Sequence, residues 1–229
     1  MKQMGYPEAA EKAFTLACID VTRAYVLELR ELGFHPDLDK VIEARIFNVN
    51  RDQVNGLKAV GMTDLELGKL VQYRIFNVTP EYVQQMRKSF PGISLEKMTE
   101  MRIHQVTPEF ASQMSSLGYS GLNVDQLIAF RIHNVTSSYI QEIDKLGFKK
   151  LDADQLIQFR IFNVNASQIE ELAKEGYGNL SAQDLVNFRI HRVDAGFIQT
   201  VKKAGYPHPT PDELVGFRIM GIRHKTAGL

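Results

Sequence analysis

The residues best suited to chemistry in this chain are arginines that recur at a nearly constant spacing. Each is followed by isoleucine, and the arginines are Arg45, Arg74, Arg102, Arg131, Arg160, Arg189 and Arg218. The intervals between them are 29, 28, 29, 29, 29 and 29 residues. A guanidinium group carries five N–H donors in a planar fork. A row of such groups could therefore fasten helix ends to one another or bind an anion.

Two interpretations of the repeated arginines follow from their place in the sequence. Arg160 lies four and three residues after the apolar pair Leu156-Ile157, which puts it on or beside the buried face of a helix. A guanidinium there needs hydrogen-bond acceptors, yet no carboxylate recurs at one position in every repeat. We therefore expect each arginine to donate to carbonyl oxygens at a helix C-terminus of its own or the neighbouring repeat. The alternative is a ladder of guanidinium groups that lines an anion-binding groove, which solvent-open side chains would favour.

Histidine recurs two residues after the arginine in three repeats, as His104, His133 and His191. Other repeats place Phe47, Phe76, Phe162 and Met220 there, so the position indicates packing. Metal binding by His104 and His133 would need further ligands. The sequence also has no HExxH, no GxSxG and no phosphate-binding glycine loop. We expect no enzyme activity, no catalytic residue, no metal and no cofactor.

The first half of each repeat has the pattern of a short helix. Thr79 can cap its N-terminus, and Pro80 falls at the first helical position, where a missing N–H costs nothing. Asn50 with Gln53, and Asn165 with Gln168, have the spacing of a capping box. Glycines that tolerate a left-handed backbone close this half: Gly33, Gly61, Gly118, Gly147, Gly176 and Gly205.

The second half predicts another helix that ends just after the arginine. Its caps lie eight residues before the arginine: Asp37, Ser94, Asn123, Asp152, Ser181 and Thr210, with Glu66 as a poorer cap. Ser181 with Asp184, and Thr210 with Glu213, predict capping boxes. The expected C-caps lie three residues after the arginine: Asn48, Asn77, Asn134 and Asn163, with Gly221 in the last repeat. Asn and Gly tolerate positive φ, so we expect a left-handed backbone at these positions.

Two short antiparallel helices per repeat cannot bury their apolar faces alone, but stacked neighbours can. The sequence therefore predicts an all-α fold, an α-solenoid of about seven to eight tandem helix-turn-helix units of roughly 29 residues. We expect a single array over residues 1–229. It would comprise a degenerate or partial first unit at 1–21, clear repeats at 22–222 and a polar tail at 223–229.

Three local features depart from the repeat. Residues 8–17 are expected to form a second-half helix that lacks its arginine. The sequence Ser89-Phe90-Pro91-Gly92 is one residue short, which predicts a local kink. Cys18 is the only cysteine, so an internal disulfide is excluded, and we expect it to be a small core residue.

The composition narrows the class of partner. The chain has 27 basic and 27 acidic residues and a net charge of zero. Nucleic acid is not favoured as a partner, because nucleic-acid binding usually shows a basic stripe. No apolar run approaches the roughly 20 residues of a membrane helix, so we expect no membrane contact from this segment.

The repeats RIHNVTSSYIQEIDKLGF and LDADQLIQFRIFNVNASQI resemble a bacterial helical repeat of the RIHxVTPEF type. Similar arrays occur in uncharacterised bacterial proteins and in the C-terminal regions of some antirepressor-type membrane metallopeptidases related to beta-lactam sensors. The resemblance covers about residues 20–222. The metallopeptidase motif is absent here, so the resemblance implies no catalytic residue. It implies a sensor or interaction segment of a larger bacterial protein, placed in the cell envelope or periplasm.

Stacked helix pairs create a long surface with repeated positions. We therefore expect a non-catalytic scaffold that binds a protein or peptide along that surface. Two alternatives stay open: a receptor for an anion or glycan polymer that uses the arginines, and a structural spacer. Salt-sensitive binding to a polyanion would distinguish the receptor.

Overall fold

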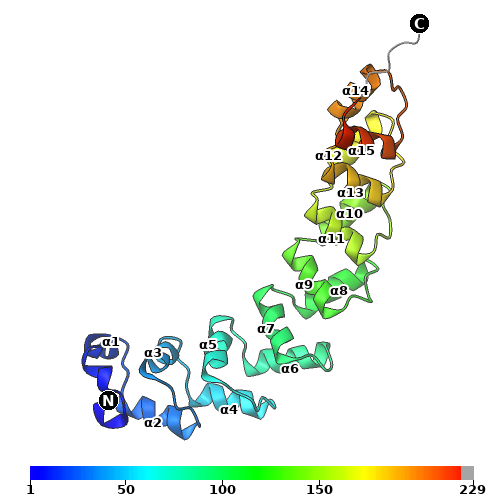
Figure 1. The fold of residues 1–229 in the computed structure, drawn as a ribbon. Helices are drawn as coiled ribbons and strands as arrows, with labels where there is room; N and C mark the ends of the chain where they lie inside the picture. Colours follow the sequence, from blue (N-terminus) through cyan, green and yellow to red (C-terminus); the bar gives the residue numbers. More distant parts are fainter. Residues whose placement is uncertain (223–229) are drawn as a thin grey trace. The chain divides into compact units, whose positions relative to one another are not determined.

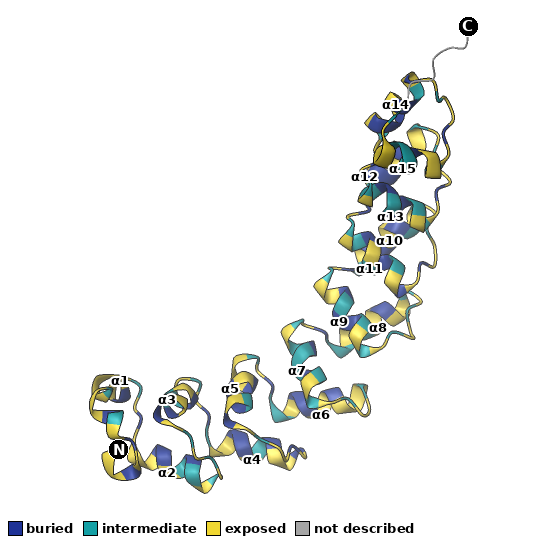
Figure 2. Cartoon of the chain, in the orientation of Figure 1, coloured by how far each residue is buried: buried dark blue, intermediate teal, exposed yellow. Residues whose placement is uncertain are grey.

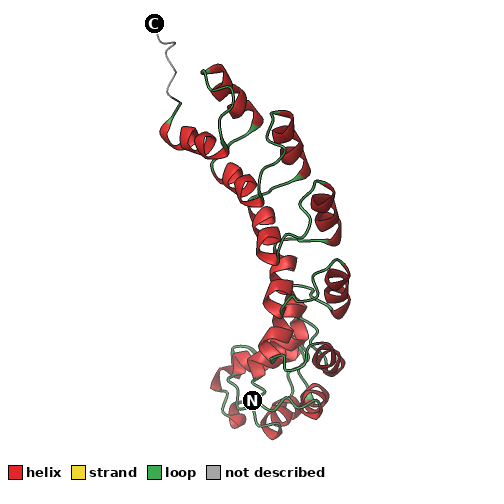
Figure 3. Ribbon diagram, turned by 90° about the vertical axis from the view of Figure 1, so that its right-hand side faces the viewer, coloured by secondary structure: helices red, strands yellow, loops and turns green. Residues whose placement is uncertain are grey.

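The computed structural model of this chain describes residues 1–222, which form short helices joined by turns and loops, with no strand in that range (Figure 3). The helices from α2 onward contain nine or ten residues each and recur with the period of the repeat. This confirms the all-α class and the tandem helix-turn-helix repeats of an α-solenoid. The expected polar tail at 223–229 lies outside the described residues. The chain divides into two compact units, Met1–Pro108 and Glu109–Leu229, and each is described by itself.

The first unit stacks its helices in two rows. Its elements are η1 (Lys2–Met4), η2 (Pro7–Ala10), α1 (Ala13–Cys18), α2 (Arg23–Glu31), α3 (Leu38–Ile46), α4 (Arg51–Ala59), α5 (Leu67–Ile75), α6 (Pro80–Ser89) and α7 (Leu95–Ile103). In Figure 1, α2, α4 and α6 follow one another in one row, and α3, α5 and α7 in the other. Contacts of α3 with α5, and of α4 with α6, join successive repeats.

The second unit repeats this arrangement. Its elements are α8 (Pro108–Ser116), which begins one residue before the boundary, α9 (Val124–Ile132), α10 (Ser137–Lys145), α11 (Ala153–Ile161), α12 (Ala166–Lys174), α13 (Ala182–Ile190), α14 (Ala195–Lys203) and α15 (Pro211–Met220). Helix α11 contacts both α9 and α13, and α13 contacts α15. The second-half helices thus form one continuous row within this unit.

The buried side chains explain why the helices need their neighbours. In α10, Tyr139, Ile140 and Ile143 are buried, and they share one face of the helix. In α9, α11 and α13, Phe130, Phe159 and Phe188 are almost completely enclosed. Figure 2 shows buried and exposed residues alternating along every helix. Each helix therefore has one face for the array and one for solvent.

Helix starts follow the predicted caps closely. In both halves of the repeat the cap side chain accepts the backbone N–H of the third residue after it, as Thr79 does from Tyr82 and Asp152 from Gln155. Glu66, predicted to be a poorer cap, forms no such bond. A cap of this kind stabilises a helix by about 1 kcal/mol. The caps therefore fix where these short helices begin.

The capping-box predictions were correct for the second-half helices and wrong for the first-half helices. The boxes of Ser181 with Asp184 and of Thr210 with Glu213 are present, and so are two that were not predicted, Asn123 with Gln126 and Asp152 with Gln155. The boxes predicted for Asn50 with Gln53 and for Asn165 with Gln168 were wrong. Both asparagines accept a backbone N–H, but Gln53 and Gln168 are buried and do not reach back to the cap.

Helix ends carry the predicted left-handed residues, one position later than a C-cap. Asn48 and Asn77 have φ of 52°, and Asn134 and Asn163 have φ of 54°. The C-cap itself is the preceding residue, such as Phe162 before Asn163. The Asn163 N–H donates to the Arg160 carbonyl and the Val164 N–H to that of Phe159, the bond pair of a Schellman motif. Placing the C-cap at the four asparagines was therefore wrong by one residue.

Three second-half helices have no asparagine at the position of the left-handed residue. Gln105 and Arg192 occupy the same position with φ of 55°, although neither residue type signals it. Gly221 is the C-cap of α15, with φ of 84° and ψ of 152°, so its backbone is not the left-handed helical one. The repeat therefore imposes the left-handed backbone at this position even where, as at Gln105 and Arg192, the residue type does not predict it.

The N-terminal segment differs from its prediction. Residues 8–17 do not form one helix: η2 ends at Ala10 and α1 begins only at Ala13. The residue that corresponds to the cap Asp37 is Ala9, which has no side-chain acceptor. Cys18 is exposed, so the expected core placement was wrong. Cys18 lies 28 residues before Ile46 and so occupies the same repeat position, where the isoleucine side chain is also exposed.

The shortened repeat changes only the connection after α6. Phe90 is the C-cap with φ of −132°, and its N–H donates to the Met86 carbonyl. The positive φ moves to Gly92, at 80°. Helix α7 then starts normally at Ser94, whose hydroxyl accepts the Lys97 N–H. The expected kink is a local rearrangement of the turn.

Candidate functional site

The repeated arginines lie one residue before the end of the second-half helices, or two residues before it in α15, and next to the end of the preceding repeat. Five donate from Nε to a carbonyl oxygen 26 or 27 residues earlier: Arg45 to Ile19 at 3.3 Å, Arg102 to Phe76 at 3.1 Å, Arg160 to His133 at 3.1 Å, Arg189 to Phe162 at 3.0 Å and Arg218 to Arg192 at 2.9 Å. These carbonyls lie at the C-cap or one residue past it. The acceptor is always in the preceding repeat, so each bond ties two repeats together.

Aromatic rings support most of these guanidinium groups. The ring belongs to the third residue of the first-half helix in the same repeat, and the carbon of the guanidinium lies above it. The pairs are Arg45 over Tyr25 at 5.1 Å, Arg102 over Tyr82 at 4.9 Å, Arg131 over Phe110 at 4.0 Å, Arg160 over Tyr139 at 4.6 Å and Arg218 over Phe197 at 4.0 Å. Such contacts contribute about 0.5–1 kcal/mol at exposed sites.

The tyrosines of this position are themselves held by hydrogen bonds. The hydroxyl of Tyr25 donates to the Val49 carbonyl at 2.9 Å, and that of Tyr139 to the Val164 carbonyl at 2.8 Å. Burial raises the pKa of Tyr25, Tyr82 and Tyr139 to about 12, although the adjacent arginine opposes the rise. The phenols therefore stay neutral donors at ordinary pH.

Two repeats replace the ring with glutamine. In the first unit Gln53 is fully bonded: its Nε2 donates to the Leu70 carbonyl at 3.0 Å, and its Oε1 accepts the Arg74 Nε–H at 3.1 Å. In the second unit Arg189 bonds the Phe162 carbonyl, and Gln168 has no partner for either polar atom. The same residue type at the same position therefore has two different outcomes.

The guanidinium groups retain unused donors and unneutralised charge. Arg45, Arg102, Arg160 and Arg189 are half-buried, and Arg74, Arg131 and Arg218 are exposed. Within residues 1–222 only Arg45 of the seven pairs with a carboxylate, that of Asp20 at 2.7 Å. For Arg102, Arg160 and Arg189, the hydrogen bond found among the described residues uses Nε alone. These three arginines thus fasten repeats through Nε, and their outer nitrogens bond no acceptor among the described residues.

A second feature of this surface was not predicted. The isoleucine after each arginine is the last or next-to-last helical residue, and its side chain is 43–65% exposed in all seven repeats. We call the seven Arg-Ile pairs, taken within each unit, the arginine–isoleucine row. Single exposed apolar residues are ordinary. One at the same position of every repeat forms a regular apolar line beside the cations. The recurrence of the Arg-Ile pair in the sequence gives the positions of this line but not its exposure.

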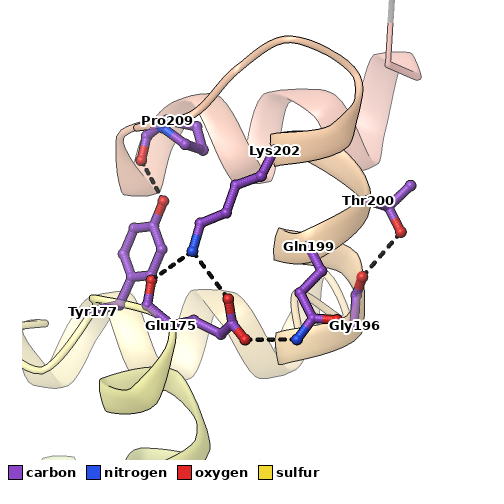
Figure 4. A network of polar contacts seen from close by, with 7 residues as sticks. All are labelled: Glu175, Tyr177, Gly196, Gln199, Thr200, Lys202 and Pro209. Carbon is purple, nitrogen blue, oxygen red and sulfur yellow. Dashed lines mark hydrogen bonds and ion pairs between the residues drawn. The ribbon is translucent and has the colours of Figure 1, made fainter.

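Basic residues of the first-half helices make a similar clamp in some repeats. The guanidinium of Arg30 donates to the Met4 carbonyl at 2.6 Å, and Arg87 bonds the Val60 carbonyl. Figure 4 shows a third case, in which the Lys202 ammonium donates to the carbonyl of Glu175 at 2.8 Å and to its carboxylate at 2.9 Å. Hydrogen bonds from Gln199 and Lys202 lower the pKa of that carboxyl group. Repeats are therefore fastened along both rows of helices.

The histidines and the metal hypothesis find no joint site. His104, His133 and His191 are half-buried C-cap residues of α7, α9 and α13. Within residues 1–222, no group of three or more His, Cys, Asp or Glu side chains is placed to hold a metal ion. None of the helices in that range is long and apolar enough to cross a membrane.

Comparisons of this chain with models of protein families, with curated proteins and with solved structures found no match.

Proposed function

We propose that this chain is a non-catalytic repeat scaffold that binds a protein or peptide along the arginine–isoleucine row. The observation that carries the proposal is the exposure of an isoleucine beside a partly unused arginine in every repeat. Arginine and apolar side chains are enriched at the centres of protein interfaces. A regular line of both is what a bound segment would need in order to make the same contact several times.

The chemistry of the row favours a partner with acidic and apolar residues. Six of the seven arginines pair with no carboxylate within residues 1–222. A carboxylate from a partner can accept two parallel N–H bonds from one guanidinium. The isoleucines supply apolar area that such a partner would remove from water, worth about 25 cal/mol for each Å². The resemblance to the bacterial repeat supports an interaction segment of a larger protein.

The proposal is tested by selecting peptides from a displayed random library on the whole chain. The matched variant carries Ile132→Thr, Ile161→Thr, Ile190→Thr and Ile219→Thr, which removes the apolar line of the second unit at exposed positions. We expect enriched peptides that combine acidic and apolar residues and that bind this variant at least tenfold more weakly. Failure to enrich any peptide, or equal binding to a variant that keeps its helical circular dichroism, would refute the proposal.

The receptor for an anion or glycan polymer remains the second candidate, because the outer nitrogens of Arg102, Arg160 and Arg189 bond no acceptor among the described residues. Dextran sulfate is a suitable probe. Binding whose affinity falls steeply with salt, and which the isoleucine variant retains, would favour this candidate, because counterion release depends on charge alone.

A further inference from the structure

Gln168 is the one side chain in residues 1–222 whose buried polar atoms all lack a hydrogen-bond partner. It is 9% exposed, and neither Nε2 nor Oε1 is bonded. A buried amide without partners has lost its hydrogen bonds to water and gained none in exchange, which is unfavourable. Gln53, at the same position of another repeat, has both atoms bonded. The cost at Gln168 is therefore not imposed by glutamine at this position of the fold.

A cavity of about 600 Å³ adjoins Gln168 in the second unit. Its walls come from α12, α13, the turn into α12 and the turn into α14, and they include Arg189, Arg192 and Asn165. The Arg189 Nε is held by the Phe162 carbonyl at 3.0 Å, which keeps that guanidinium away from the Gln168 carbonyl oxygen. No acceptor among residues 1–222 bonds the Arg192 side chain.

The polar groups around this cavity define the chemistry of a ligand. A carboxamide offers one acceptor and two donors, which matches the N–H and C=O of a peptide group. The two guanidinium groups match a carboxylate. Asp194 and Glu171 also line the cavity, but Asp194 accepts the Phe197 N–H at 2.8 Å and Glu171 accepts the Ser167 hydroxyl at 2.8 Å.

We propose that this cavity is a subsite for an acidic residue of a bound peptide. The Gln168 carboxamide pairs with the main-chain amide of that residue, and Arg189 and Arg192 bind its carboxylate. The subsite rests on the proposed peptide-binding function and deepens it, because it specifies which class of peptide residue is bound and which repeat binds that residue. The polar atoms of Gln168 are closed to water in the free chain, so binding requires its side chain or that of Arg189 to turn toward the cavity.

The direct test is a nuclear magnetic resonance titration of the whole chain with N-acetyl-glutamate N-methylamide, which carries two amide groups and one carboxylate. Glutarate supplies the charge alone and N-methylacetamide the amide alone. We expect saturable shifts of the Gln168 side-chain amide and the Arg189 Nε–H with the first probe, at concentrations several-fold lower than with either fragment. The Gln53 side-chain amide serves as an internal control and should not move.

Gln168→Tyr is the matched variant. Tyrosine occupies this position in three other repeats, and its hydroxyl there bonds a carbonyl of the fold. We expect the variant to keep its helical circular dichroism and to lose the shifts at Arg189. A second variant, Gln168→Leu, removes the carboxamide without adding a ring and should lose them as well.

Three results would overturn the subsite. They are an unmoved Gln168 amide with every probe, equal shifts at Gln53, and shifts at Arg189 that survive Gln168→Tyr. A Gln168 amide bonded to the Leu185 carbonyl in the free chain, as Gln53 is to Leu70, would also overturn it. These results leave the peptides selected on the arginine–isoleucine row unaffected, so failure of the subsite and failure of the proposed function are distinguishable.

Discussion

The Nε of Arg160 in α11 donates to the carbonyl oxygen of His133, the C-cap residue of α9, at 3.1 Å. The guanidinium carbon lies 4.6 Å from the centre of the Tyr139 ring, and the Tyr139 hydroxyl bonds the Val164 carbonyl ahead of the next repeat. One arginine and one tyrosine therefore connect three successive repeats. Because a helix C-terminus has carbonyls that the helix itself leaves unbonded, the arrangement suits any sequence that provides the two side chains.

The first prediction concerns this clamp. Arg160→Ala should lower the free energy of unfolding by about 1–3 kcal/mol, since it removes a charged hydrogen bond and a cation–π contact. Arg160→Lys should recover only part of the loss, because an ammonium cannot fill the ring contact and the Nε–H position together. Urea denaturation followed by circular dichroism measures both.

Lys174→Ala is the control for the clamp, since Lys174 is exposed and makes no hydrogen bond or ion pair within residues 1–222. It should change stability by a few tenths of a kcal/mol, as is usual for surface positions away from specific contacts. An equal loss for Arg160→Ala and Lys174→Ala would contradict the clamp.

The second prediction concerns the left-handed stop at Asn163, whose φ is 54°. Asn163→Ala should destabilise the chain by about 1–2 kcal/mol, because a Cβ without a local polar side chain is strained there. Asn163→Gly should be neutral within a few tenths of a kcal/mol, since it adds freedom to the unfolded chain while relieving the same strain. Similar stabilities for the Ala and Gly variants would show that the backbone there is not held at positive φ.

The helix pattern was predictable from the sequence because its determinants are local. A cap such as Thr79 acts on the N–H of Tyr82 three residues away, and Asn163 closes the helix that immediately precedes it. For the arginines, the sequence predicted only the kind of acceptor, a carbonyl at a helix C-terminus. Whether that carbonyl belongs to the same repeat or to the preceding one depends on how two repeats stack, and no residue of the arginine's own repeat determines the stacking.

The sequence alone did not predict that the glutamines turn inward or that the isoleucines are exposed, and the reason is different. Gln168 fits a capping-box spacing as well as Gln155 does, yet one turns inward and the other caps. The difference lies in what the neighbouring helix leaves room for. An isoleucine at the end of a helix likewise suggests a core position from sequence alone. In the structure the next repeat does not cover it, as Ile161 shows.

The third prediction contrasts the two glutamines. Gln168→Tyr should raise the free energy of unfolding by about 1 kcal/mol or more, because it removes an unbonded buried amide and supplies a ring for Arg189. Gln53→Tyr should do the reverse, because it breaks bonds to Leu70 and Arg74. Thermal unfolding of the two variants in one buffer compares them. Equal effects in sign would mean that Gln168 is bonded in solution as Gln53 is.

The last prediction concerns alkaline pH. Burial raises the pKa of Tyr25, Tyr82 and Tyr139 from 10.0 to about 12. The folded state thus holds these protons more tightly than the unfolded state, so their contribution to stability is complete below pH 10 and is lost as the pH rises from about 10 to about 12. The urea concentration at the unfolding midpoint should fall as the pH rises through this range. The tyrosinate absorbance of the folded chain should rise at a higher pH than that of free tyrosine. Alkaline pH also affects other groups in any protein, so the informative comparison is with Tyr25→Phe, Tyr82→Phe and Tyr139→Phe combined. That variant should start less stable, because it lacks the hydroxyl bonds to Val49, Met98 and Val164, and should lose less stability between the two pH values. Parallel declines for the two proteins would show that the phenols titrate as they do in water and are not buried donors.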